Sequence, residues 1–153
     1  MRIKRVGLIL GLAIACTWAA EGLVELRSAY GVEETSRRLV DFFRQKGIRL
    51  FKVIDHAEGA RRAHMSLRPT KLLIFGNPYL GTPVMECAQT AAIDLPQKML
   101  IYQNARGETV VAYNDPDYLF ARHGIPRECS PEIRKKMKTV LAKIARYAAG
   151  SAR

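Results

Sequence analysis

Residues 67–78 read Leu-Arg-Pro-Thr-Lys-Leu-Leu-Ile-Phe-Gly-Asn-Pro, with an uninterrupted apolar run from Leu72 to Phe75. A short apolar run bounded by turn residues is typical of a central strand that is buried on both faces. Gly76 and Asn77, which follow it, both tolerate positive φ, so we expect a tight turn at the end of the strand. Such a turn either closes a sheet edge or, together with Asn77, forms the polar wall of a pocket.

The segments around this strand alternate between helical and extended patterns. Residues 32–46 carry an apolar stripe and stop at Gly47, which predicts an amphipathic helix with a glycine C-cap. Residues 23–30 and 48–54 have strand patterns, and residues 99–102 and 109–113 flank a predicted hairpin turn at 104–107. Shorter helices are expected at 57–65, from 82 onward and at 115–123.

The last predicted helix, residues 130–149, has the most complete start signals. Ser130 is in the N-cap position, Pro131 in the first helical position, and Glu132 adds favourable charge. One face of the helix is apolar and most of its bases lie off that face; the apolar residues are Ile133, Met137, Val140, Leu141, Ile144 and Tyr147. The chain has no internal repeat and no linker, so residues 20–153 are expected to form one α+β domain.

The N-terminus predicts export. Residues 1–5 carry three bases and no acid, and an apolar run of about 15 residues follows, shorter than the ~20 that a spanning helix needs. A signal peptide over 1–19, cut after Ala19, is the first interpretation. The second is a lipoprotein signal with Cys16 as the acylated residue, and the third is an uncleaved anchor. In each case the domain is placed in the periplasm or elsewhere outside the cytoplasm, free or tethered to the membrane.

The charge of the chain points to anionic partners. The net charge is +11, and removing the three bases of the signal leaves 22 bases against 14 acids, or +8. A positive field of this size favours an acidic protein, the membrane surface or an anionic ligand as a partner, although it also serves solubility alone. Export argues against nucleic acid.

Cys87 and Cys129 remain after cleavage at Ala19, and an oxidising compartment permits a disulfide between them. Their separation in sequence neither supports nor excludes the bond, because geometry decides it. The chain contains no CxxC, no CxxCH and no zinc-ligand spacing.

Several short motifs resemble the domain of unknown function 302 family, over about residues 26–125. The resemblance implies a β-α-β(4)-α fold with an antiparallel-rich sheet and two main helices. The fold is similar to one half of the TATA-binding-protein architecture and often dimeric, so a homodimer is expected. It implies no established activity. The matching stretches are residues 54–57, 67–78, 81–85, 92–96, 113–116 and 122–123.

Polar residues of these motifs are the candidates for a ligand site. His56 follows Asp55 at a strand end and His123 lies at a helix end, and histidine can shuttle a proton or bind a metal near pH 7. Asp94 could orient one of them by accepting its ring N–H. Each of these residues could equally serve as a local cap. We expect a shared site where Asp55, His56, Asn77, Met85, Asp94 and His123 converge.

Met85 offers a soft sulfur ligand beside His56 and His123, a set that would suit copper or haem iron, although methionine in an apolar segment commonly fills a core. GxSxG, HExxH and GxGxxG motifs are absent, so an enzyme is the less favoured class. The sequence predicts an exported binding or accessory module for haem, a soft metal or a small ligand, in periplasmic redox or sulfur chemistry. The alternatives are a small enzyme with a His/Asp acid-base pair and a structural subunit of a membrane-associated complex.

Overall fold

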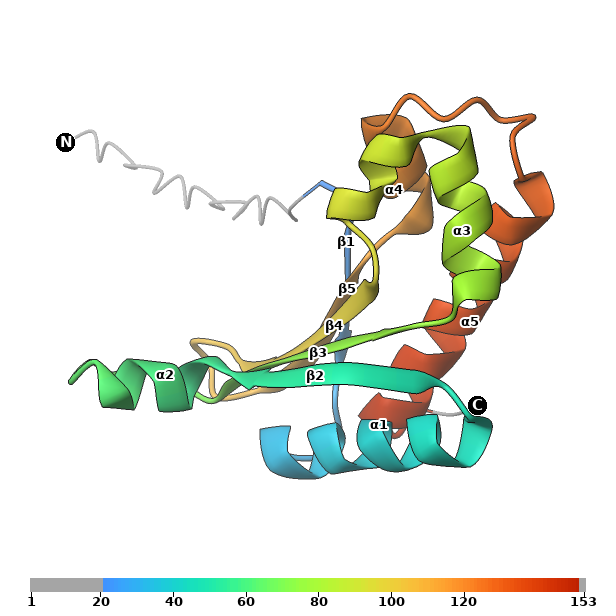
Figure 1. Ribbon diagram of the computed structural model, residues 1–153. Coiled ribbons are helices and arrows are strands. Elements are labelled where there is room, and N and C mark those ends of the chain that lie inside the picture. Colours follow the sequence, from blue (N-terminus) through green and yellow to red (C-terminus); the bar gives the residue numbers. More distant parts are fainter. Residues whose placement is uncertain (1–20, 152–153) are drawn as a thin grey trace, which may run out of the picture.

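Five antiparallel strands form one sheet in the computed structural model, which describes residues 21–151 (Figure 1). The predicted signal peptide, with Cys16 and the cut at Ala19, lies outside these residues. The elements are β1 (Leu23–Arg27), α1 (Val32–Lys46), β2 (Arg49–Asp55), α2 (His56–Arg62), β3 (Thr70–Gly76), α3 (Pro78–Cys87), the 3-10 helix η1 (Gln89–Ile93), β4 (Gln97–Gln103), β5 (Thr109–Asn114), α4 (Pro116–Arg122) and α5 (Pro131–Ala149).

The strand order β1-β5-β4-β3-β2 confirms the predicted α+β class and the β-α-β(4)-α succession. Strands β2 to β5 follow one another as an antiparallel meander, and β1 pairs with β5 at the far edge. Helix α2 interrupts the meander at one end of the sheet, and α3 with η1 interrupts it at the other end (Figure 1).

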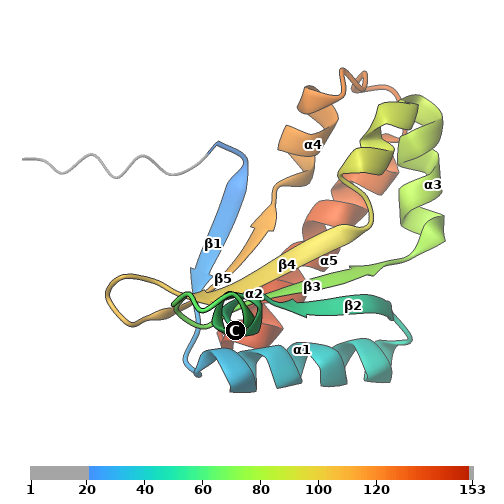
Figure 2. The same cartoon turned by 60° about the vertical axis from the view of Figure 1, so that its left-hand side comes forward.

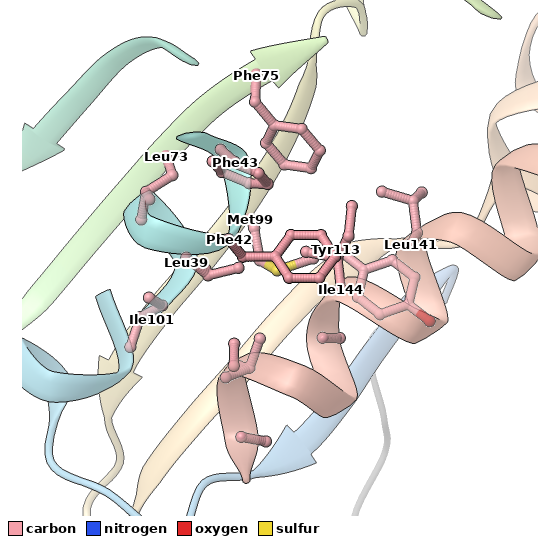
Figure 3. Close-up of a cluster of buried hydrophobic side chains, with 14 of the residues drawn as sticks. Leu39, Phe42, Phe43, Leu73, Phe75, Met99, Ile101, Tyr113, Leu141 and Ile144 are labelled. Atoms are coloured by element: carbon pink, nitrogen blue, oxygen red, sulfur yellow. The ribbon is translucent and has the colours of Figure 1, made fainter. Parts of the chain in front are cut away.

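Helices α1 and α5 pack against one face of the sheet and enclose the main hydrophobic core (Figures 2 and 3). The ring of Phe43 on α1 stacks on Phe75 of β3 with 4.5 Å between centroids. Leu141 and Ile144 of α5, both nearly inaccessible to solvent, come from the apolar stripe that the sequence assigned to this helix. The helical spacing of apolar residues thus fixes how α5 faces the sheet.

The prediction that β3 is buried on both faces is wrong. Leu73 and Phe75 are buried in the core, whereas Leu72 and Ile74 on the opposite face are half-buried, because α1 and α5 cover one side of the sheet only. The strand with buried residues on both faces is β5, where five consecutive side chains from Thr109 to Tyr113 are buried.

The predicted end of α1 is correct, whereas the predicted start of α5 is only partly correct. Gly47 terminates α1 at φ 64° and donates its N–H to Arg44, as the glycine C-cap predicted. Ser130 does precede Pro131 at the start of α5, but its φ is 52° and its side chain accepts no capping hydrogen bond.

Within residues 21–151, the helices are too short or too polar to cross a bilayer.

Candidate functional site

A cavity of about 490 Å³ lies at the end of the sheet where β2 begins and β3 ends. Its walls come from the α1–β2 connection, the end of β3, α3, the segment before β4 and one side of α5. Cavities of about 300–1,000 Å³ are typical of small-molecule sites. The lining residues are Lys46, Ile48, Arg49, Phe51, Phe75, Gly76, Asn77, Pro78, Leu80, Gly81, Met85, Leu95, Pro96, Gln97, Lys136, Met137, Val140, Leu141 and Ile144.

The inner wall of this pocket is part of the hydrophobic core. Phe75, Leu141 and Ile144 are each no more than 3% exposed and belong to the cluster between the sheet and the helices (Figure 3). Met137 adds a third buried side chain from α5. Because these side chains are held by core packing, the pocket is preformed and needs no rearrangement to present an apolar surface.

Three residues of the pocket lining are charged, and all three are cations. Lys46 ends α1, Arg49 begins β2 and Lys136 lies on the first half of α5, and all three are exposed. The guanidinium of Arg49 lies over the ring of Phe51, 4.9 Å from its centroid. The charged side chains of the lining are therefore all positive, and most of the remaining lining is apolar.

Asn77 belongs to the pocket wall, and it does not use the positive φ that asparagine tolerates. Its φ is −141°, and its Oδ1 accepts a hydrogen bond of 2.9 Å from the N–H of Tyr79, so Asn77 is the N-cap of α3. Gly76 is closely packed: a Cβ there would lie 3.3 Å from the Cβ of Pro96, so any side chain at this position would require Pro96 to shift slightly. The Gly-Asn-Pro motif turns the chain directly from β3 into the helix that covers the pocket.

A disulfide connects two walls of the pocket. Cys87 is the last residue of α3 and Cys129 lies two residues before α5, with 6.0 Å between their Cα atoms. Beside the bond, Val84, Phe120 and Met137 belong to a second hydrophobic cluster. The bond fixes the helix that follows β3 to the start of α5.

Asp94 and His123 form a compact polar cluster at the same end of the sheet. His123 Nε2 lies 2.7 Å from Asp94 Oδ2, and its Nδ1 lies 3.1 Å from the hydroxyl of Thr90. The side chains of His123 and Asp94 are 7% and 15% exposed, and Arg122 approaches Asp94 to 3.4 Å. The cluster ties η1 to α4, and its neighbour Leu95 lines the pocket.

Asp55 and His56 lie elsewhere, at the start of α2. Asp55 is the N-cap of α2 and accepts a hydrogen bond of 2.9 Å from the N–H of Glu58. This backbone hydrogen bond, assisted by Lys71 at 3.5 Å, lowers the pKa of the Asp55 carboxyl against the opposing effect of desolvation. His56 is the first residue of α2 and is exposed.

The single shared site expected from the sequence is therefore wrong. Asp55 pairs with Lys71 at one end of the β2–β3 hairpin, whereas Asn77 follows Gly76, the partner of Arg49, at the other end. At about 3.3 Å per residue, the length of β3 separates them by about 20 Å. Asn77 and Met85 line the pocket, Asp94 and His123 pair nearby, and Asp55 and His56 remain apart, where α2 projects from the sheet (Figure 1).

The three predicted metal ligands, His56, Met85 and His123, are also separated in the fold. His56 lies at the α2 end of the sheet, while Met85 lines the pocket and His123 faces Asp94. Among residues 21–151, no three His, Cys, Asp or Glu side chains are grouped so that they could hold a metal ion. The predicted copper or haem ligation by these three residues therefore does not form.

Sequence reasoning missed the three cations and the part played by α5. The apolar stripe predicted for the last helix includes Val140 and Leu141, but nothing in that pattern identified them, or the exposed Lys136, as the wall of a pocket. Their positions in the sequence could have indicated the two basic residues around the start of β2. Lys46 and Arg49 flank Gly47 and Ile48, so both lie where β2 begins, at the end of the sheet where β3 terminates.

Comparisons with known proteins identify relatives of the whole domain. The family model described as "Domain of unknown function DUF302" matches residues 24–144. A crystal structure of an uncharacterized conserved protein DUF302 from Bacillus stearothermophilus superposes with a TM-score of 0.73 at 22% identity, covering 84% of this chain and 99% of that one. That likeness supports the fold; the similarity to the TATA-binding-protein architecture stays a prediction.

Curated relatives share more sequence but are longer. A protein named "Fluoride-specific ion channel FluC 1" from Brucella suis biovar 1 (strain 1330) is 36% identical over 129 residues, 84% of this chain and 50% of its own length. "Fluoride-specific ion channel FluC 2" from Brucella melitensis biotype 1 is also 36% identical over 129 residues, which make up 47% of that protein. The chain thus spans about half the length of these relatives.

Proposed function

We propose the function of this chain from its pocket, because the chain belongs to the family of domains of unknown function DUF302, whose description names no activity. The protein is a binding module for a small, largely apolar molecule. One observation carries the proposal. A cavity of about 490 Å³, within the range of small-molecule sites, has an inner wall of core side chains and few polar groups. Such a cavity binds by burying apolar surface without first reorganising the protein.

The test is uptake of a neutral apolar fluorophore, N-phenyl-1-naphthylamine, followed by fluorescence. Val140 is half-buried in the pocket wall, so Val140→Trp should fill part of the cavity and weaken binding by about tenfold or more. Thr139→Trp adds the same ring at the next, exposed position of α5, outside the pocket, and should bind like the wild type. Absence of saturable one-to-one uptake by the wild type would refute the proposal.

We propose further that the module acts outside the cytoplasm. The three bases and the apolar run of residues 2–20 support this, as does the Cys87–Cys129 disulfide, because such bonds persist in oxidising compartments. The intact mass of the mature protein tests it: a cut after Ala19 and an acylated Cys16 give different masses, and a full-length cytoplasmic chain would contradict export.

An enzyme is the second candidate, favoured by the Thr90–His123–Asp94 arrangement. His123 Nδ1 is within reach of the Thr90 hydroxyl and could take its proton, while Asp94 accepts a hydrogen bond from Nε2 and orients the ring. A nucleophile, a base and an orienting carboxylate are the parts needed for acyl transfer.

Hydrolysis of p-nitrophenyl butyrate tests this second candidate. If it is correct, Thr90→Val and His123→Gln should each lower turnover at least a hundredfold while the circular dichroism spectrum of the domain is retained. A wild-type rate equal to that of buffer, or a Thr90→Val variant as active as the wild type, would reject it.

The third predicted role, a structural subunit of a membrane-associated complex, draws support from the names of the longer relatives. What those proteins transport is a property of the whole relatives, of which this chain matches about half. This role, the homodimer and an acidic protein or membrane surface as partner all stay predictions.

A further inference from the structure

The charges around the pocket narrow the class of ligand. Lys46, Arg49 and Lys136 line it, and within residues 21–151 no acidic side chain does. Many basic side chains of the described residues form ion pairs with acidic ones. Examples are Arg27, Arg37, Arg44, Arg61, Arg62, Lys71, Arg106, Arg122 and Lys138. None of the three pocket cations has an ion-pair partner among the described residues.

The three cations also converge from separate elements. Lys46 comes from the last turn of α1, Arg49 from the first residue of β2, and Lys136 from α5, about 90 residues later in the chain. Packing of α1 and α5 on the same face of the sheet brings them to one cavity. An anion bound in this cavity would therefore meet positive charge supplied by three elements, while the other lining residues are uncharged.

We propose that the ligand is a single-chain anionic amphiphile, an apolar chain that ends in a carboxylate or a phosphate. The inference rests on the proposed function of the pocket and adds to it the sign of the charge on the ligand. The chain occupies the cavity lined by Phe75, Met85 and Leu141, and the head group lies among the three cations. Asn77 and Gln97 provide uncharged hydrogen-bonding groups in the same lining.

This arrangement distinguishes ligands by their head groups. A carboxylate or phosphate binds more tightly because the three cations attract it. An alcohol of equal chain length is stabilised only by burial of its chain, and a quaternary amine is repelled. The discrimination is electrostatic, so it should weaken as ionic strength rises.

The experiment displaces bound N-phenyl-1-naphthylamine with four ligands that each carry a ten-carbon chain, at low salt and below their micellar concentrations. The ligands are decanoate, decyl phosphate, decanol and decyltrimethylammonium. At least one of the two anions should bind about tenfold or more tightly than decanol, and the cation should bind most weakly. The triple variant Lys46→Gln, Arg49→Gln, Lys136→Gln should reduce that preference to about twofold or less.

A matched triple variant separates the pocket from the overall charge of the protein. Lys52→Gln, Lys135→Gln and Lys143→Gln remove the same charge from exposed positions outside the pocket and should keep the preference for the anion. If decanol binds as tightly as both anions, or if the two triple variants lose the preference equally, the inference is overturned while the pocket remains a binding site. If neither the fluorophore nor any of the four ligands binds, the proposed function itself fails.

Discussion

Phe43→Ala is expected to lower the free energy of unfolding by about 3–5 kcal/mol, the range for deleting a buried aromatic side chain. Phe43 is 1% exposed and lies between α1 and the sheet, where it stacks on Phe75 and meets Phe42 edge to face at 6.5 Å. An alanine leaves a cavity that rigid strand neighbours cannot close (Figure 3). Urea unfolding followed by circular dichroism measures the change.

The same substitution reaches the ligand site, because Phe75 is shared by the core and the pocket. Removing its stacking partner should loosen this wall and weaken fluorophore binding even under conditions where the variant remains folded. Tyr79→Ala is the control: its side chain is 83% exposed, so its effect on unfolding should stay within about 0.5 kcal/mol. A loss below 1 kcal/mol for Phe43→Ala would mean that α1 is not packed as described.

The helices were the most predictable part of the fold. Apolar spacing and a glycine stop determined α1, whose residues agree with the prediction from Val32 to Lys46, and much of the apolar stripe predicted for the last helix packs in the core. Both signals are local, since they depend on side chains within one or two turns of each other. The left-handed conformation of Ser130 was not predictable, because serine at a helix start is normally an extended N-cap.

Burial of the strands could not be read from local sequence. The run from Leu72 to Phe75 is more uniformly apolar than Thr109 to Tyr113, yet β5 is the strand that is buried on both faces. Strands β3 and β5 both lie one strand from an edge of the sheet, so their difference in burial depends on packing with segments distant in sequence.

The predicted shared site is wrong for a different reason, the direction in which successive strands run through the sheet. In an antiparallel meander, successive strands run in opposite directions, so groups that follow β2 and groups that follow β3 leave at opposite ends. Asp55 ends β2 and His56 follows it, whereas Asn77 follows β3 and Asp94 precedes β4, which begins at that second end. Applied to the predicted strands, this rule would have separated His56 from Asn77 and Asp94.

Removal of the disulfide by Cys87→Ala and Cys129→Ala together is expected to lower the free energy of unfolding by about 4 kcal/mol. The two cysteines are 42 residues apart, and closing a loop of this length removes entropy from the unfolded chain by about that amount. Wild-type protein treated with a reductant should show the same loss, and the double variant should be insensitive to the reductant. Thermal and urea unfolding, each with and without reductant, give the comparison.

The bond should also matter for binding, because it connects α3 to the start of α5, the two helices that face each other across the pocket. Without it the walls are held by side-chain packing alone, and we expect weaker fluorophore uptake by reduced protein that is still folded. An unfolding free energy that changes by less than 1 kcal/mol on reduction would contradict the stability estimate. Unchanged uptake together with the full loss of stability would mean that packing of Met137, Leu141 and Ile144 alone sets the pocket shape, and the bond then serves only the fold.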